Sequence, residues 1–303
     1  MNPHLTGLIA APFTPMTPDG GLNLPMVEKL AGSLVANTIS GAFVCGSTGE
    51  SMSLSVAERM ALAGRWQEVA AGHIPIIVHV GHTSLPEARA LAAHAGEIGA
   101  FAVAAMAPPF FRPRTLEALV MWCEAVAAAA GEVPFYYYHL PSLTGAAFGM
   151  YDFLQLAGPR IPNLAGIKFT HCDLMDYLRC LRFEAGRYNM LFGVDEQLLA
   201  GLATGAAGAV GSTYNYSAPL YRRIIDAYQA GDMVIAQRTQ LQAANEVAIL
   251  VKYGGLATGK AIMKLIGLDV GPPRLPLCEL GDDQVRQLRA DLEQTGFFNA
   301  CSR

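Results

Sequence analysis

One lysine of the sequence lies where a side chain could act as a nucleophile. Lys168 belongs to the apolar run at residues 164–169, where an unpaired ammonium group is costly to bury. A lysine in such a place usually loses its proton, and the neutral amine attacks ketones to form a Schiff base. The alternative is a strand-end lysine that reaches water or pairs with an acid. The other four lysines fall in helical patterns or on surfaces, where lysine is ordinary: Lys29, Lys252, Lys260 and Lys264.

Three consecutive tyrosines end another apolar run, at residues 134–138. Successive side chains of a strand alternate between its faces, so Tyr136 and Tyr138 share one face and Tyr137 takes the other. An inward phenol at this strand end could relay protons to a substrate held by Lys168. The alternative is that the tyrosines only pack the interior of the protein, and packing alone explains at least two of the three.

A polar loop at residues 46–50 reads Gly-Ser-Thr-Gly-Glu. Its glycines allow close approach to the backbone, and the hydroxyls of Ser47 and Thr48 flank N–H groups at a possible helix start. Such a site has the size and polarity for a carboxylate. The alternative is a plain tight turn.

A second polar loop follows the run at residues 189–193 and places Asp195 beside Glu196. Adjacent acids would repel phosphate, but carboxylates accept hydrogen bonds from sugar hydroxyls. The alternative is that Asp195 caps the start of a helix. The last apolar run also ends in hydroxyl groups, at Ser212 and Thr213.

Four histidines lie near the ends of these runs, at positions 79, 82, 139 and 171. His79 and His82 form an H-x-x-H pair, which occurs in metal sites. However, His79 falls within an apolar run and no carboxylate adjoins the group. We therefore expect no metal and no other cofactor.

Eight short apolar runs must position these side chains. Most are spaced by about 30 residues, the length of one βα unit, with helical patterns at residues 55–71, 84–98 and 115–130 between them. This alternation predicts an α/β fold, a (β/α)8 TIM barrel, whose site lies at the carboxyl ends of the strands. An open doubly wound sheet is the alternative, but no G-x-G-x-x-G follows the first run. The runs are residues 7–12, 41–45, 75–80, 101–107, 134–138, 164–169, 189–193 and 208–212.

The remainder of the chain predicts a helical extension. Residues 232–252, 258–266 and 282–295 have helical patterns, interrupted by Gly254-Gly255 and by Gly271-Pro272-Pro273. We therefore divide the chain into a catalytic barrel at residues 1–222 and a C-terminal extension at residues 223–303 that packs on it.

Composition excludes several classes of protein. With 15% charged and 52% hydrophobic residues, the chain of 303 residues is not intrinsically disordered. A net charge of −4 and the lack of a basic run argue against a nucleic-acid partner.

The mean hydropathy of +0.30 raises the question of a membrane-spanning helix. However, the longest uncharged stretch, residues 197–221, contains glycines, a proline and hydroxyl groups, which argues against such a helix. Six cysteines without a C-x-x-C pair, and no signal peptide, suggest reduced, mostly buried thiols in the cytoplasm.

Four segments together resemble one known family, the dihydrodipicolinate synthase/N-acetylneuraminate lyase superfamily of Schiff-base aldolases. The similarity runs in order from about residue 8 to residue 277 and is most specific for the lyase branch. The segments are Gly46-Ser47-Thr48-Gly49-Glu50, Tyr138-His139-Leu140-Pro141-Ser142-Leu143-Thr144-Gly145, Gly166-Ile167-Lys168 and Gly193-Val194-Asp195-Glu196.

The resemblance implies a function and a role for each matching residue. The activity would be the reversible cleavage of N-acetylneuraminate to N-acetylmannosamine and pyruvate, without a cofactor, by a cytoplasmic homotetramer. Lys168 would form the Schiff base, Tyr138 would act as acid and base, and Ser47 and Thr48 would hold the pyruvate carboxylate. The sugar portion would contact Thr170, Gly193, Asp195, Glu196 and Ser212.

Two positions depart from the superfamily pattern. The synthase branch has an arginine for its second substrate where this chain has Leu143, which argues against synthase activity. Where much of the superfamily has a tyrosine that reaches a neighbouring subunit, this chain has Phe111. A phenyl ring cannot pass a proton, so Ser47, solvent or a substrate group would have to complete the relay.

The alternatives to this function are another 2-keto-3-deoxy sugar acid aldolase, a synthase-like enzyme, a metal-dependent aldolase using the histidines, or a barrel that binds keto acids without turnover.

Overall fold

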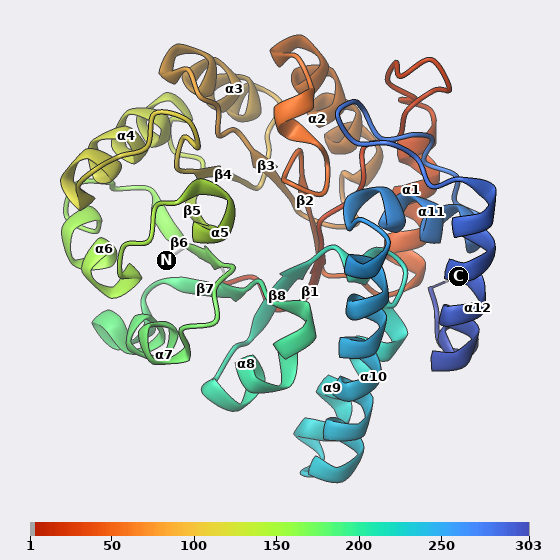
Figure 1. Ribbon diagram of the computed structural model, residues 1–303. Coiled ribbons are helices and arrows are strands. Elements are labelled where there is room, and N and C mark those ends of the chain that lie inside the picture. Colours follow the sequence, from red (N-terminus) through yellow and green to blue (C-terminus); the bar gives the residue numbers. More distant parts are fainter. Residues whose placement is uncertain (1–3, 303) are drawn as a thin grey trace.

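Eight parallel strands close into a barrel in the computed structural model, which describes residues 4–302 (Figure 1). The strands pair in chain order, and the last one pairs with the first to close the sheet. The prediction of a (β/α)8 barrel is therefore confirmed. The strands are β1 (Gly7–Ala10), β2 (Gly41–Val44), β3 (Ile76–His79), β4 (Ala102–Met106), β5 (Phe135–His139), β6 (Leu164–Phe169), β7 (Asn189–Phe192) and β8 (Gly208–Gly211).

Helices surround the barrel and alternate with its strands (Figure 1). They are α1 (Met26–Ala36), α2 (Val56–Ala70), α3 (Leu85–Glu97), α4 (Leu116–Ala129), α5 (Pro141–Thr144), α6 (Met150–Ala157), α7 (Leu174–Arg182), α8 (Leu198–Thr204) and α9 (Ala218–Gln229). Short 3-10 turns are η1 (Ser51–Ser53), η2 (Phe183–Gly186), η3 (Asp195–Gln197), η4 (Thr213–Asn215) and η5 (Phe297–Asn299). The extension adds α10 (Met233–Lys252), α11 (Leu256–Leu265) and α12 (Asp282–Thr295).

The predicted bounds of strands and helices differ from the observed ones by at most two residues. The differences of two residues are at β1, which ends at Ala10 and not at residue 12, and at α11, which begins at Leu256 and not at residue 258. Gly254 and Gly255, with φ of 109° and 68°, make the break before it. The run at residues 134–138 is shifted by one, so that His139 ends β5.

Two layers of apolar side chains form the core. One lies between the strands and the helices, and the other fills the inside of the barrel. The tyrosines of β5 divide between them as predicted: Tyr136 and Tyr138 point inward, whereas Tyr137 points outward and stacks on Phe153. Burial of each such side chain contributes roughly 1.5–3 kcal/mol to folding.

The extension packs on the barrel through α10, which lies along α9 and η3, and α12 packs against α10 (Figure 1). Gln240 of α10 accepts a hydrogen bond from the backbone N–H of Leu199 at 2.8 Å, which fastens α10 to the start of α8. The expected boundary at residue 222 falls inside α9. The division of the chain into two parts therefore stays a prediction.

The prediction of mostly buried thiols is wrong. All six cysteines are free, but only Cys45, Cys123 and Cys180 are buried. Cys172 lies in the loop after β6 and Cys278 in the segment between α11 and α12, where no core element covers them. No helix within residues 4–302 is long and apolar enough to cross a membrane.

Candidate active site

A pocket of about 400 Å³ opens at the carboxyl ends of the strands. It brings together eight of the nine residues that the sequence placed at the site. Ser47 is the exception, although its hydroxyl lies beside one of the lining residues. Those that line the pocket are Thr48, Tyr138, Lys168, Thr170, Gly193, Asp195, Glu196 and Ser212.

Lys168 projects from β6 into this pocket between two aromatic rings. Its Nζ lies 4.1 Å from the ring centres of Phe43 and Tyr138, and the residue is 4% exposed. Across the part of the chain that the structure describes, no carboxylate forms an ion pair within 4 Å of this Nζ. The alternative of an ion-paired strand-end lysine is therefore not what the structure shows. The amine lies against these two rings and faces the pocket.

Tyr138 stands next to Lys168 because the two residues pair across β5 and β6. Its ring contacts Phe43 and His79 edge-on, with centres 5.3 Å and 5.8 Å away. These contacts fix the ring, and its hydroxyl lies 3.4 Å from the Ser47 Oγ. The distance permits a weak hydrogen bond or an approach that tightens when substrate binds.

The loop at residues 46–50 is a turn, and the helix expected to start beside its hydroxyls is no more than a short 3-10 helix that begins at Ser51. Only the short turn η1 follows it, and α2 begins after Ser55, which caps that helix together with Glu58. The loop is bounded by Cys45 and Glu50, whose φ values of 57° and 55° are left-handed and unfavourable for residues other than glycine. A carboxylate here would meet the side-chain hydroxyls and turn N–H groups without the aid of a helix.

Asp195 is buried at the wall of the pocket and accepts two hydrogen bonds from Thr213. The donors are the backbone N–H at 3.0 Å and the Oγ1 at 2.6 Å. Burial raises the pKa of Asp195 to about 6, and these hydrogen bonds counteract part of that effect. The alternative that Asp195 caps a helix is wrong, because Val194 occupies the cap position of η3 and no side chain caps it. Glu196 is exposed and lines the pocket opening.

Thr170 and Gly193 meet closely at the ends of β6 and β7. A Cβ at position 193 would lie 2.2 Å from the Thr170 Oγ1, so only glycine fits there. This hydroxyl is buried and has no hydrogen-bond partner among the residues 4–302. It is therefore available to a molecule that enters the pocket.

The four histidines do not lie together in one place. His79 lies inside the barrel and His139 on the outer face of β5, whereas His82 and His171 lie in the loops after β3 and β6. His79 Nδ1 lies 2.9 Å from the carbonyl of Cys45, and His82 Nδ1 accepts from the N–H of Ser84 at 3.0 Å. Burial lowers the pKa of His139 to about 3, and the nearby His171 adds to this effect. In the described part of the chain, no three His, Cys, Asp or Glu side chains are close enough together to hold a metal ion.

Several lining residues were missed from the sequence. His171 and Cys172 directly follow Thr170, and Ser142 comes four residues after Tyr138, so the loop positions themselves were a usable signal. Val247 and Leu250 come from α10 and form part of the wall. Nothing in their apolar character distinguishes them from ordinary helix packing.

Fold and pocket together define a (β/α)8 barrel with a lysine-based site at the carboxyl ends of its strands. The model of the Dihydrodipicolinate synthetase family matches residues 4–295, and the chain belongs to this family.

Relatives within this family are similar over almost the whole chain. The N-acetylneuraminate lyase of Gallus gallus is 41% identical over 95% of this chain and 96% of that protein. The solved structure of the Proteus mirabilis N-acetylneuraminate lyase is 42% identical, with a TM-score of 0.95 over 97% of this chain and 100% of the other. The N-acetylneuraminate lyase, or sialic acid aldolase, of Aliivibrio salmonicida is 41% identical, with a TM-score of 0.95 over 97% and 98%.

Proposed function

We propose that this protein is a Schiff-base aldolase that reversibly cleaves N-acetylneuraminate to N-acetylmannosamine and pyruvate. The observation that carries the proposal is the placement of Lys168, caged by Phe43 and Tyr138 and facing the pocket. The similarity of the protein to N-acetylneuraminate lyases along nearly the full chain supports the choice of substrate.

The reaction begins with attack by the Lys168 amine on the keto carbon of the open-chain sugar acid. The carbonyl oxygen leaves as water, and the protonated imine becomes an electron sink. Ser47 and Thr48 hold the adjacent carboxylate in the loop at residues 46–50. Because this anchor and the strand of Lys168 are both fixed, the keto carbon is held near the nucleophile.

Tyr138 accepts the proton of the C4 hydroxyl while the C3–C4 bond breaks. The bonding electron pair moves to C3 and forms an enamine on Lys168, and C4 becomes the aldehyde of N-acetylmannosamine. Protonation of C3 and hydrolysis of the imine then release pyruvate and restore the amine. Ser47 Oγ, 3.4 Å from the Tyr138 hydroxyl, is placed to take part in this proton transfer. No step requires a metal or cofactor.

The wall opposite the keto-acid end would contact the polyhydroxyl chain of the sugar. Its donors and acceptors come from the loops after β6, β7 and β8. Carboxylates accept from sugar hydroxyls, and free hydroxyls can donate or accept. The residues are Thr170, Gly193, Asp195, Glu196 and Ser212.

The protein would act on this small molecule as a homotetramer in the cytoplasm. Phe110 and Phe111, both exposed and with ring centres 4.9 Å apart, support assembly with further copies, since monomers seldom expose large apolar groups side by side. Six free cysteines, none of them in a disulfide, support a reducing compartment.

Borohydride reduction in the presence of pyruvate tests the chemistry. The treated protein should gain one three-carbon unit, and peptide mapping should place it on Lys168. Attachment to Lys260, the other buried lysine, would contradict the assignment. Lys168→Ala should fold but neither trap pyruvate nor cleave substrate.

A product assay tests the choice of substrate. The expected result is release of pyruvate from N-acetylneuraminate in preference to other 2-keto-3-deoxy sugar acids. A preference for another sugar acid would indicate a different aldolase. Inactivation by a chelator without trapping would indicate a metal-dependent enzyme, and trapping without any cleaved product would indicate a binding protein.

A further inference from the structure

Glu50 ends the loop that carries Ser47 and Thr48, and its side chain is buried away from water. It forms an ion pair with Lys260 of α11, with 2.6 Å between Lys260 Nζ and Glu50 Oε1. The two side chains are 1% and 2% exposed. Lys260 lies in a helix as expected, but it is not an ordinary surface lysine, because α11 docks with this side chain against the loop of Glu50.

The ion pair is connected to main-chain groups on both sides. Lys260 Nζ also donates to the carbonyls of Thr14 at 3.1 Å and Pro272 at 2.8 Å. The other carboxylate oxygen of Glu50 accepts from the backbone N–H of Arg274 at 2.8 Å. Both partners of Glu50 thus belong to the C-terminal extension, and the loop near the active site depends on how that extension docks.

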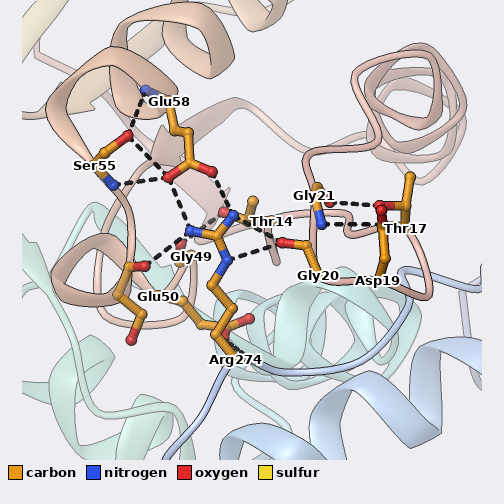
Figure 2. Close-up of polar contacts among 11 residues, drawn as sticks. Thr14, Thr17, Asp19, Gly20, Gly21, Gly49, Glu50, Ser55, Glu58 and Arg274 are labelled. Atoms are coloured by element: carbon orange, nitrogen blue, oxygen red, sulfur yellow. Dashed lines mark hydrogen bonds and ion pairs between the residues drawn. The ribbon is translucent and has the colours of Figure 1, made fainter.

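The Arg274 side chain fixes the segment that follows the loop (Figure 2). Its guanidinium forms two hydrogen bonds with the carboxylate of Glu58 and donates to the carbonyls of Ser53 and Gly20. The hydrogen bonds from Arg274 lower the pKa of Glu58 to about 2. Glu58 in turn caps α2 together with Ser55, as Figure 2 shows.

A close backbone contact brings Arg274 into place. The N–H of Met16 donates to the carbonyl of Val270 at 2.9 Å. At Gly271, which has a φ of 69°, a Cβ would lie 2.1 Å from the Met16 carbonyl oxygen. Gly271, Pro272 and Pro273 therefore do more than separate helices, because they lead the chain from α11 back to the loop.

This arrangement suits positioning better than stabilisation alone. A buried ion pair often contributes no more to stability than apolar residues of the same size, but it demands a defined geometry. The left-handed backbone at Cys45 and Glu50 is unfavourable and persists only where its surroundings hold it in place. Glu50 is held by Lys260 and Arg274, neither of which lines the pocket, and Ser47 and Thr48 lie between Cys45 and Glu50 in the chain.

We propose that Glu50, Lys260 and Arg274 are positioning residues that set the loop at residues 46–50 for binding of the substrate carboxylate. This inference rests on the proposed function, since it takes Ser47 and Thr48 as the carboxylate anchor. The extension thereby completes the keto-acid end of the site without contacting the substrate there.

Pyruvate trapping on Lys168 measures the effect without any sugar. One variant, Arg274→Ala, removes a half-buried side chain. A second, the double variant Glu50→Gln with Lys260→Met, removes the buried charges but keeps similar side-chain volumes. The matched control is Lys252→Ala, which breaks the ion pair with Asp291 that joins α10 to α12 in the same extension.

Both variants should need about ten- to hundredfold more pyruvate for half-maximal trapping, the range expected when hydrogen bonds to a charged group are misplaced. The trapping rate at saturating pyruvate should change less, and the control should match the unsubstituted protein. Thermal unfolding identifies the temperature at which every variant is folded. Unchanged half-saturation in the folded variants, even with a lowered melting temperature, would overturn the proposal. Absence of trapping in the unsubstituted protein would instead overturn the proposed function, and this inference with it.

Discussion

Lys168 and Tyr138 occupy paired positions on neighbouring strands, and the Lys168 Nζ lies 4.1 Å from the centre of the Tyr138 ring. The barrel thereby supplies a nucleophile and a proton acceptor from two rigid elements. Because both side chains come from strands, their separation does not depend on a mobile loop. The ring packs against the amine, while the hydroxyl extends toward Ser47.

Tyr138→Phe should separate the two roles of this residue. The ring that packs on Lys168 remains, so borohydride should still trap pyruvate. Cleavage of N-acetylneuraminate should fall by about 10²–10⁴-fold, the usual contribution of a positioned acid or base. Measurement of kcat and of trapping on the same preparation checks both expectations.

Tyr136→Phe is the matched control for this change. Tyr136 points into the same barrel interior but donates to Asn189 at 2.9 Å and does not line the pocket. Loss of the Tyr136 hydroxyl and its hydrogen bond should lower the free energy of unfolding by about 1 kcal/mol and leave kcat unchanged. Equal losses of kcat in the two variants would argue against a specific role for Tyr138.

The barrel and its reactive centre could be predicted because their signals are local. Strands buried on both faces read as apolar runs, and their spacing fits βα units. A lysine within such a run, as at Lys168, stands out against its neighbours. The rule that sites lie at the carboxyl ends of barrel strands then predicts that Thr48, Asp195 and Ser212 belong to the same site, without any knowledge of their contacts.

The contribution of the extension could not be predicted because it depends on how distant segments dock. Lys260 lies in an ordinary helical pattern, and its partner Glu50 lies at the other end of the chain. Val247 and Leu250 likewise resemble core residues of any amphipathic helix. The hydrogen bonds from Thr213 to the carboxylate of Asp195 also join two separate turns, and the sequence around Asp195 gives no sign of them.

Glu196→Gln tests the sugar end of the pocket. Glu196 is exposed at the opening, so its loss should not disturb the fold, whereas Asp195 also serves Thr213. Loss of a charged acceptor for a sugar hydroxyl costs about 1–3 kcal/mol. The ratio kcat/KM for N-acetylneuraminate should therefore fall by about five- to a hundredfold, with pyruvate trapping unchanged. Normal cleavage by this variant would show that Glu196 does not bind the sugar.

Leu143 should exclude synthase activity. It is 60% exposed on α5 and offers no charge to a second carboxylate. Pyruvate bound to Lys168 should therefore condense poorly with aspartate semialdehyde, and a coupled assay should detect little product. Efficient condensation would favour a synthase over a lyase.

Glu246 should make the stability of the protein depend on pH. It is 5% exposed on α10 and accepts hydrogen bonds from Ser217 at 2.8 Å and Gln242 at 3.3 Å. Burial raises its pKa from an ordinary 4.5 to about 7. Between these values the folded protein keeps a proton that the unfolded chain releases, so the contribution of Glu246 to stability falls as pH rises from 4.5 to 7. The slope approaches about 1.4 kcal/mol per pH unit, and the total is of the order of 3 kcal/mol.

Urea unfolding of the wild-type protein and Glu246→Gln at pH 5, 6 and 7 isolates this contribution. The lowered pKa values of His79 and His139 act in the opposite direction, because they make the protein less stable as pH falls below about 6.5. Both histidines are present in both proteins, so their contribution cancels in the difference. The wild-type protein should therefore lose stability relative to the variant as pH rises. Glu293→Gln, which changes an exposed glutamate on α12, should show no such trend. Parallel pH profiles for wild type and Glu246→Gln would mean that Glu246 is ionised in the folded protein throughout this range.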